Sequence, residues 1–292
     1  MSQQRGSTIR VRVDPTNPGQ FFACCGLLEL ANRLWRGAEG WFEDSGCGFE
    51  LRPLSAAHVA TDDLLLQAVR CPLSNTMTDA QLGRREVLSA IPKKCRSPAL
   101  EAEKARLDGI WRESPLILGQ PFSILLDWFL DDRAGGSDLK TWAGQQSVVD
   151  IARSMQSAAN LVSHELAPEQ WLSARANNDS LPFNFDSDLG AVGSALDVGF
   201  SFDPLKGVNV QTRPVIEFTA FLGLQRFRPR RMNAENRYRY ETWTQPLEPS
   251  VAQMAASGLL HTKEATIWEF NLLYRTKYLK SFLPSQPTGG PQ

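Results

Sequence analysis

The sequence contains no run of about 18 consecutive apolar residues, so nothing in it predicts a transmembrane helix. The N-terminal stretch MSQQRGSTIRVRV also lacks the apolar segment of a secretory signal. We therefore expect a cytoplasmic protein that does not act at a membrane. In that compartment its five cysteines are expected to be reduced thiols.

The motifs of common catalytic and cofactor sites are missing as well. There is neither a Gly-x-x-x-x-Gly-Lys loop nor a Gly-x-Gly-x-x-Gly fingerprint, and His58, His164 and His261 lie far apart outside any metal motif. Cys24 and Cys25 are adjacent, and neighbouring helical residues point about 100° apart, so one metal does not suit both. The sequence thus predicts a non-enzyme with no catalytic residue, metal or cofactor. A cysteine hydrolase using either thiol is a remote alternative, because a nucleophile and its base need not be close in sequence.

The composition is that of an ordinary globular protein, with 42% hydrophobic and 22% charged residues in 292. Helical and hairpin patterns are mixed without regular strand–helix alternation, which predicts an α+β fold of helices and antiparallel hairpins rather than a doubly wound sheet. We expect an N-terminal α+β region (1–167) and a C-terminal α+β region packed on it (168–284), with a single domain as the alternative. Residues 285–292 are expected to form a disordered tail.

The stretch DPTNPGQFFACCGLLELANRLW predicts a helix capped by Asn17 and begun by Pro18, with the two cysteines on its apolar face. Core packing is therefore the favoured interpretation of the thiols. The turn before the helix would leave amide groups of Asn17, Gly19 and Gln20 exposed, where a phosphate could bind. Farther along, the poor apolar pattern of residues 93–108 predicts an exposed loop with a short helix.

Positive charge is concentrated although the formal net charge is −1. The segment from Arg226 to Arg239 has six arginines and one acid, Glu235, with Phe227, Tyr238 and Tyr240 among them. This composition suits contacts with phosphates and stacking on bases or sugars. The alternative, arginines paired with acids on a strand face, is equally weighted.

A second candidate segment is KTWAGQQS, which follows a Gly-Gly turn and leads into a helix. Its glutamines suit hydrogen bonds to base edges, and a loop with an aromatic and two amides could enter a duplex. For Trp142 itself, an anchor in the core is the favoured interpretation.

Four stretches together resemble a CRISPR-associated family of type I-U (also called I-G) loci, a large-subunit-like family of Csb-three type. They are DPTNPGQFFACCGLLELANRLW, KTWAGQQS, PVIEFTAFLGLQRFRP and YRTKYLKSFLP. They occur in this order from Asp14 to Pro284, so the resemblance covers nearly the whole chain.

The resemblance implies a non-catalytic large subunit of a Cascade complex in antiviral defence. Such a subunit recognises the protospacer-adjacent motif in target double-stranded DNA, assists R-loop formation and recruits the helicase–nuclease. The implied partners are the guide RNA, the guide-RNA backbone subunit and the subunit that holds the 5′ handle. Guide pairing then reads the sequence, while protein reads the short motif and the backbone. The alternative is an architectural subunit that contacts guide RNA and neighbouring subunits without reading the motif.

Residue chemistry, rather than the resemblance, assigns the DNA contacts. For insertion into the duplex or contact with the motif, the candidates are Lys140, Gln145 and Gln146. For phosphate contacts, the candidates are Arg226, Arg228, Arg230 and Arg231. Further candidates for contact with nucleic acid or a partner chain are Asn17, Gly19, Gln20, Arg237, Arg239, Lys277 and Lys280.

Overall fold

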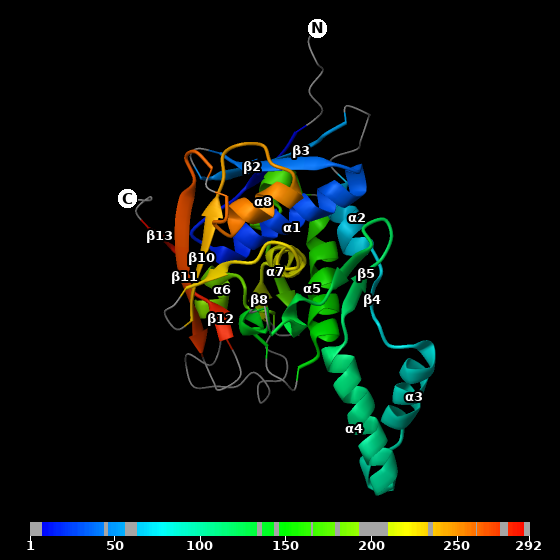
Figure 1. The fold of residues 1–292 in the computed structure, drawn as a ribbon. Coiled ribbons are helices and arrows are strands. Elements are labelled where there is room, and N and C mark those ends of the chain that lie inside the picture. The colour runs from blue at the N-terminus through cyan, green and yellow to red at the C-terminus, as the bar shows by residue number, and fades with distance from the viewer. Residues whose placement is uncertain are drawn as a thin grey trace.

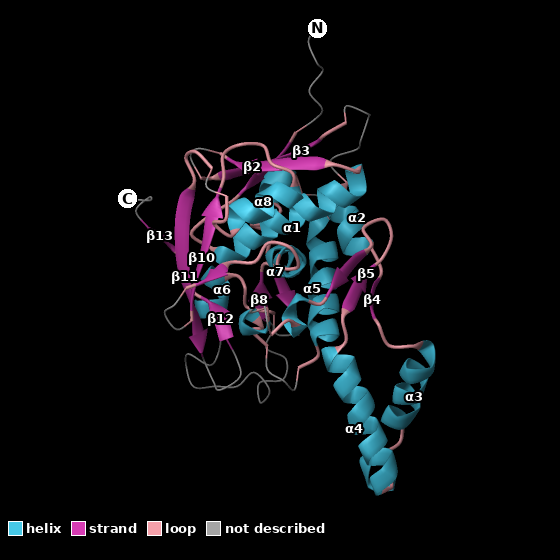
Figure 2. Cartoon of the chain, viewed as in Figure 1, coloured by secondary structure: helices cyan, strands magenta, loops and turns pink. Residues whose placement is uncertain are grey.

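The computed structural model has an α+β fold, as the sequence predicts, and its sheets are small and antiparallel (Figures 1 and 2). It describes residues 8–43, 46–55, 63–132, 136–142, 146–164, 166–178, 182–192, 210–232, 236–260, 262–274 and 280–288.

The α-helices are α1 (Pro18–Trp35), α2 (Leu64–Arg70), α3 (Asp79–Ala90), α4 (Pro98–Glu113), α5 (Val148–Ser163), α6 (Ser187–Val192), α7 (Pro214–Gly223) and α8 (Pro249–Ala256). Short 3-10 helices are η1 (Lys93–Cys95), η2 (Trp128–Leu130), η3 (Ser137–Leu139) and η4 (Pro168–Gln170). The strands are β1 (Ile9–Arg12), β2 (Ala38–Phe42), β3 (Gly48–Pro53), β4 (Leu73–Asn75), β5 (Leu116–Leu118), β6 (Ile124–Leu126), β7 (Ala176–Asn178), β8 (Val210–Thr212), β9 (Arg230–Arg231), β10 (Arg237–Thr242), β11 (Thr266–Tyr274), β12 (Lys280–Phe282) and β13 (Gln286–Thr288).

Two central helices, α1 and α7, hold the fold together (Figure 1). All ten residues of α7 are buried, and so are the first fourteen of α1. The helices cross at Gly26 and Gly223, where an added Cβ would run into the backbone of the other helix at Thr219 and Phe22 respectively. Glycine is needed at both positions because the two backbones are in direct contact.

The sheets surround this helix pair. The order β1-β3-β2 forms one sheet, β4-β5-β6 a second and β7-β8 a third. In the largest sheet, β9, β10 and β11 are successive neighbours. Glu269 of β11 is opposite Arg239 of β10 and also opposite Gln286 of β13, so β13 lies on the edge of β11 away from β10.

One continuous core extends across the predicted boundary at residue 168. Its buried side chains come from both regions, including Phe22 of α1 and Phe221 of α7. Trp243, which follows β10, donates a 2.7 Å hydrogen bond from Nε1 to the Gly40 carbonyl of β2. The single-domain alternative therefore agrees with the packing better than two regions with separate cores.

The prediction of a disordered tail is wrong for residues 285–288. Ser285 is buried, and β13 pairs with β11. Backbone hydrogen bonds to an open strand edge order this segment, although its composition is typical of disorder.

The prediction of a loop over residues 93–108 is also wrong, because α4 is a helix of 16 residues. Ser97 caps it by accepting a hydrogen bond from the Leu100 N–H, and Pro98 begins it. Only Leu107 and Trp111 of α4 are fully buried, since the helix packs mainly against α3. Such a narrow apolar stripe gives a weak periodic signal.

No helix among the described ranges combines the length and the apolar character needed to cross a membrane.

Candidate nucleic-acid interface

A cavity of about 510 Å³ brings three guanidinium groups together between α1, β6 and the chain after α7. Arg33 comes from α1, while Arg226 and Arg228 follow α7, and Gln225, Gln253 and Ser123 add polar side chains. Two of these arginines were predicted as phosphate contacts. Arg33 was missed, although its spacing from Glu29 along the helix is that of an i, i+4 ion pair and marks it as part of a charged set.

The carboxylate of Glu29 fixes two of the three guanidiniums. Its side chain is only 3% exposed, and its oxygens lie 2.8 Å from Arg33 Nε and 2.6 Å from Arg226 Nε. A guanidinium has five N–H donors, so each arginine keeps donors beyond those that Glu29 occupies. The arrangement presents fixed donors to an anion such as a phosphate.

A second group of cations lies around Asp138 in η3. Arg231 of β9 forms an ion pair with the Asp138 carboxylate, and Lys280 of β12 donates a 2.8 Å hydrogen bond to the Asp138 carbonyl. The ammonium of Lys140 lies 5.6 Å from the ring centre of Trp142. Burial lowers the pKa of Lys280, with further lowering by the charges of Arg231 and Lys140, against a raising effect of Asp138. The charges of Arg231 and Lys140 therefore both act on Lys280.

The segment that leads into η3 connects the two groups. Arg228 Nη1 lies 2.5 Å from Asp131 Oδ2, and the Asp131 carbonyl accepts a 2.7 Å hydrogen bond from the Gly136 N–H, directly before η3. We call the combined surface the basic stripe. It consists of Arg33, Lys140, Arg226, Arg228, Arg231 and Lys280. Four of its six cations, Arg33, Arg226, Arg228 and Arg231, pair with three carboxylates, those of Glu29, Asp131 and Asp138, so it retains an excess of positive charge.

Arg230 is a predicted phosphate contact that lies outside the stripe. It is exposed, and no carboxylate among the described residues pairs with it. It lies opposite Arg239 of β10 in the antiparallel ladder, so both side chains are on one face, while Arg231 is on the other. Arg239 is held by Glu269, with 2.6 Å between Nη2 and Oε1.

Five of the six arginines between residues 226 and 239 have an acidic partner in the structure. Pairing with acids is thus correct for these five, although only Arg231, Arg237 and Arg239 of them lie on strands. Part-exposed ion pairs contribute little to stability, about 0 to 1 kcal/mol each, and can be exchanged for a phosphate. The ion pairs of the free protein are therefore compatible with phosphate binding by the same arginines.

The loop predicted to enter DNA is partly in the core. Trp142 is 2% exposed and packs among Trp128, Phe129 and Phe183, which confirms it as a core anchor. Gln146 is partly exposed, directly before the Ser147 cap of α5. Of the predicted contacts, Gln145 and Lys277 lie outside the described residues.

The predicted phosphate site at the start of α1 is wrong, because residues 182–187 cover this helix end. Asn17 is fully buried and donates a 2.8 Å hydrogen bond from Nδ2 to Asp186 Oδ1. A Cβ on Gly19 would lie 2.5 Å from the Phe185 carbonyl oxygen. Gln20, 6% exposed, accepts a hydrogen bond from the Asp14 N–H. The amides are therefore occupied by protein.

A buried polar cluster lies behind this helix end. Arg213 Nε is 2.6 Å from Asp186 Oδ2, and Arg213 also pairs with Asp188. Glu217 of α7 accepts hydrogen bonds from the N–H groups of Phe185 and Asp186. Burial, reinforced by the Asp186 charge, raises the pKa of Glu217 to about 8. The hydrogen bonds and ion pairs of this cluster hold residues 185–188 against the start of α1 and against α7.

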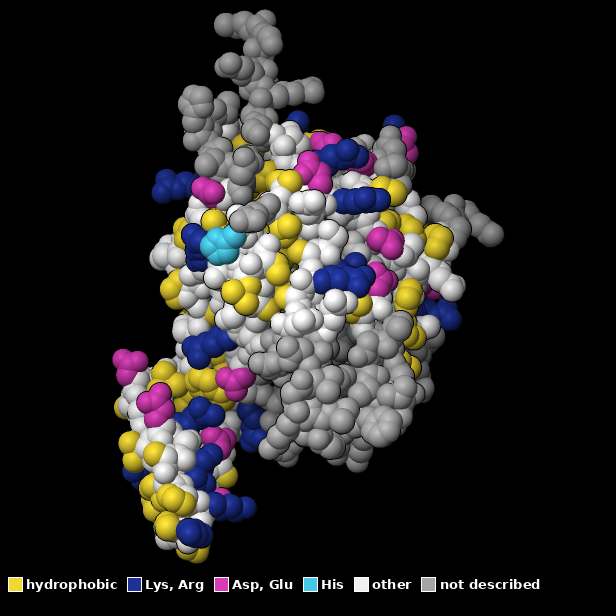
Figure 3. Space-filling model, turned by 180° about the vertical axis from the view of Figure 1, so that it is seen from behind, with side chains coloured by type: hydrophobic (Ala, Val, Ile, Leu, Met, Phe, Trp, Pro, Cys, Tyr) yellow, Lys and Arg dark blue, Asp and Glu magenta, His cyan; other side chains and the backbone are white. Residues whose placement is uncertain are grey.

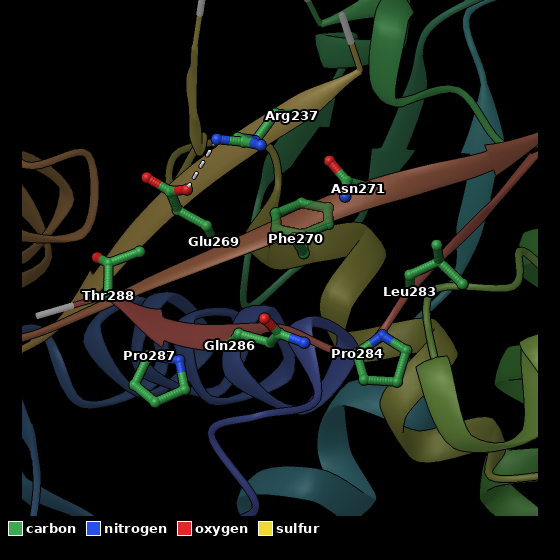
Figure 4. A pocket seen from close by; sticks show the side chains of 9 residues that line it. All are labelled: Arg237, Glu269, Phe270, Asn271, Leu283, Pro284, Gln286, Pro287 and Thr288. Atoms are coloured by element: carbon green, nitrogen blue, oxygen red, sulfur yellow. Dashed lines mark ion pairs between the residues drawn. The ribbon is translucent and has the colours of Figure 1, made fainter. Parts of the chain in front are cut away.

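Figure 4 shows a cavity of about 470 Å³ beside β11 and β13, lined by the predicted contact residue Arg237. There Arg237 Nη1 lies 3.6 Å from Glu269 Oε2, and the other polar lining groups are the neutral Asn271, Gln286 and Thr288. One cation is thus balanced by one carboxylate. The basic stripe, with its excess of cations, suits a polyanion better.

The cysteine alternative meets a physical obstacle. Cys24 and Cys25 are fully buried, and burial raises the pKa of both thiols well above the ordinary value. A nucleophilic cysteine needs the opposite, an accessible thiol with a lowered pKa. Packing in the core accounts for both residues.

Comparisons of the chain with protein-family models, curated proteins and solved structures found no match.

Proposed function

We propose that this chain is the non-catalytic large subunit of a type I CRISPR Cascade complex. In the cytoplasm it would bind target duplex DNA beside the guide RNA, recognise the protospacer-adjacent motif, assist R-loop formation and recruit the helicase–nuclease. The four stretches that resemble the Csb-three family give the proposal its biological setting. The observation that carries DNA binding is the basic stripe, whose residues come from α1, the residue after η3, the chain after α7, β9 and β12, yet lie on connected surfaces.

The stripe favours contact with phosphates over reading of bases. Its four guanidinium groups are held by protein acids at one side, and all of its guanidinium and ammonium groups are donors only. Phosphate contacts fix the position of a protein on a duplex, while sequence is read in the grooves. In this proposal the stripe therefore positions the duplex, and the predicted contacts Gln145 and Gln146 hydrogen-bond the motif through their side-chain amides.

Charge reversal tests the role of the stripe. The variant R228E/R230E/R231E, which reverses two arginines of the stripe and the predicted phosphate contact Arg230, should bind duplex DNA more weakly than the wild type and with a flatter dependence of log K on log salt, because phosphate contacts release counterions. A matched control is R12E/R70E/K263E, which changes the same charge at exposed cations without a carboxylate partner in the described structure. Equal affinities and slopes for the variant and the wild type would remove the stripe from the DNA path.

An architectural role is the second candidate, favoured by the acidic partners of five arginines. These pairs could be replaced by contacts with guide RNA or neighbouring subunits. Binding of assembled complexes, with and without this subunit, to targets with and without the motif separates the candidates. Discrimination that persists without the subunit would contradict motif reading.

A further inference from the structure

Helices α3 and α4 form an arm that projects from the rest of the fold (Figures 1 and 2). At its base, the Thr76 N–H donates a hydrogen bond to the Pro115 carbonyl, and Trp111 Nε1 donates one to Asp150 of α5. Helix α3 packs mainly against α4, with Leu88 and Leu107 buried in the arm. The distal end of the arm, around η1, is consequently held away from the central core.

Ion pairs between the two helices give the arm a defined shape. Arg84 Nη2 lies 2.7 Å from Glu103 Oε2, and Arg85 Nε lies 2.9 Å from Asp108 Oδ1. These acids are thereby engaged along the shaft of the arm. Figure 3 shows basic, acidic and hydrophobic side chains together on the face of the arm seen from behind.

The tip of the arm has a different charge balance. Residues 91–97, IPKKCRS, contain three cations and no acid. Arg96 is engaged by Glu101 at 3.1 Å and by the Ile91 carbonyl. Lys93 and Lys94 are exposed, and no carboxylate of the described residues pairs with either. The two ammonium groups are therefore available to a ligand.

The chemistry of the tip favours the phosphate backbone of a duplex over other partners. Proteins that hold single strands stack the bases on aromatic side chains, and the tip has no aromatic residue. Protein interfaces are centred on apolar and aromatic side chains, whereas Ile91 at the tip is partly buried and the exposed charged side chains there are Lys93 and Lys94. Two exposed lysines are suited to the closely spaced charges of duplex DNA.

We infer that the tip of the α3–α4 arm binds the phosphate backbone of duplex DNA through Lys93 and Lys94, at a distance from the basic stripe. This inference rests on the proposed DNA-binding function. The 16 residues of α4 extend about 24 Å at 1.5 Å per residue, a length of about seven base pairs at 3.4 Å each. The arm thus lengthens the footprint of the protein on DNA without reading its sequence.

Charge reversal at the tip, with two lengths of DNA, tests the inference. For the full chain, K93E/K94E should weaken binding to a 30-base-pair duplex and lower the salt slope by about two. Binding to a hairpin with a stem of about six base pairs, about 20 Å long at 3.4 Å each and so shorter than the arm, should be unchanged. The control R12E/K263E should match the wild type on both duplexes. Unchanged long-duplex affinity and slope in K93E/K94E would overturn the inference, and so would an equal loss on both duplexes.

Cys95, exposed beside Lys94, allows a direct test of proximity. A thiol-attached photocrosslinker on Cys95 in a C47S variant should crosslink to the long duplex. The same reagent on exposed Cys47 in a C95S variant is the control, because Cys47 lies in the distant β2–β3 hairpin. Crosslinks from Cys47 but none from Cys95 would overturn the inference.

If the wild type binds no duplex at all, the proposed function itself fails. If the wild type binds the duplex and the tip variants bind it equally well, DNA binding by the arm is contradicted while the proposed function stands.

Discussion

Arg228 and Asp131 form an ion pair, with 2.5 Å between Nη1 and Oδ2, that joins the chain after α7 to the segment leading into η3. Both side chains are part-exposed, at 23% and 35%. The pair links the guanidinium cavity to the cations around Asp138, and it places a negative charge within the basic stripe. The acids of the stripe therefore have two opposing effects, since they position the cations and also weaken their attraction for a polyanion.

Neutralising two of these acids should strengthen DNA binding. In D131N/D138N, Arg228 and Arg231 lose their carboxylate partners, so the affinity for duplex DNA should rise and its salt dependence should become steeper. The free energy of unfolding should fall by only about 0 to 1 kcal/mol for each lost pair. Fluorescence anisotropy over a salt series measures the first effect, and urea denaturation the second.

The matched control for this experiment is E169Q/E248Q, which removes two exposed acids outside the stripe. It should leave the salt slope close to that of the wild type. Weaker DNA binding by D131N/D138N in a well-folded protein would mean that the acids chiefly position the stripe or contact the partner themselves.

Alanine at the crossing of α1 and α7 should destabilise the protein. In G26A the new methyl group would meet the Thr219 carbonyl of α7, so the helices must separate, at a cost of about 1 to 3 kcal/mol or more. In α4, by contrast, a Cβ at Gly109 meets no atom within 4 Å. G109A should therefore stabilise the protein by about 0.4 to 1 kcal/mol. Chemical denaturation of both variants gives the comparison, and equal effects would show that the two backbones do not touch at Gly26.

Features determined by local sequence were predicted well. Asn17 followed by Pro18 marks the start of α1, because a helix cap depends on neighbours in the chain. The occupation of the α1 N-terminus could not be predicted, since Asp186 is 169 residues from Asn17. In the candidate site, too, local features were predicted and long-range contacts were not. Composition identifies the arginines, whereas their acidic partners and Arg33 are brought to them by the tertiary fold.

The stability of the protein should decrease as the pH rises from about 4.3 to about 8, through the titration of Glu217. Its pKa of about 8 in the folded state lies above the value of about 4.3 in an unfolded chain. Between these two pH values Glu217 is protonated in the folded state but ionised in the unfolded chain. The contribution of Glu217 protonation to the free energy of unfolding is therefore fully present below pH about 4.3 and is lost as the pH rises through about 8. The slope is at most about 1.4 kcal/mol per pH unit.

The variant E217Q provides the control for this effect. Phe185 and Asp186 donate to different oxygens of Glu217, so glutamine, with one acceptor oxygen, keeps only one of these hydrogen bonds and should lower the overall stability. Because glutamine does not titrate, urea midpoints of E217Q measured between pH 5 and 8.5 should nevertheless vary less with pH than those of the wild type. The same pH dependence in both proteins would assign it to other groups.

The five thiols should divide into two classes in the native protein. Cys47 and Cys95 are exposed and should react readily with iodoacetamide at neutral pH. Cys24, Cys25 and Cys71 are buried, and burial raises the pKa of each, which lowers the fraction of reactive thiolate. Mass spectrometry of labelled peptides should show modification of these three only after unfolding in guanidinium, where all five react. If Cys24 or Cys25 reacted as fast as Cys95 in the folded protein, an accessible, activated thiol would exist in α1, and the cysteine hydrolase would displace core packing as the explanation of this pair.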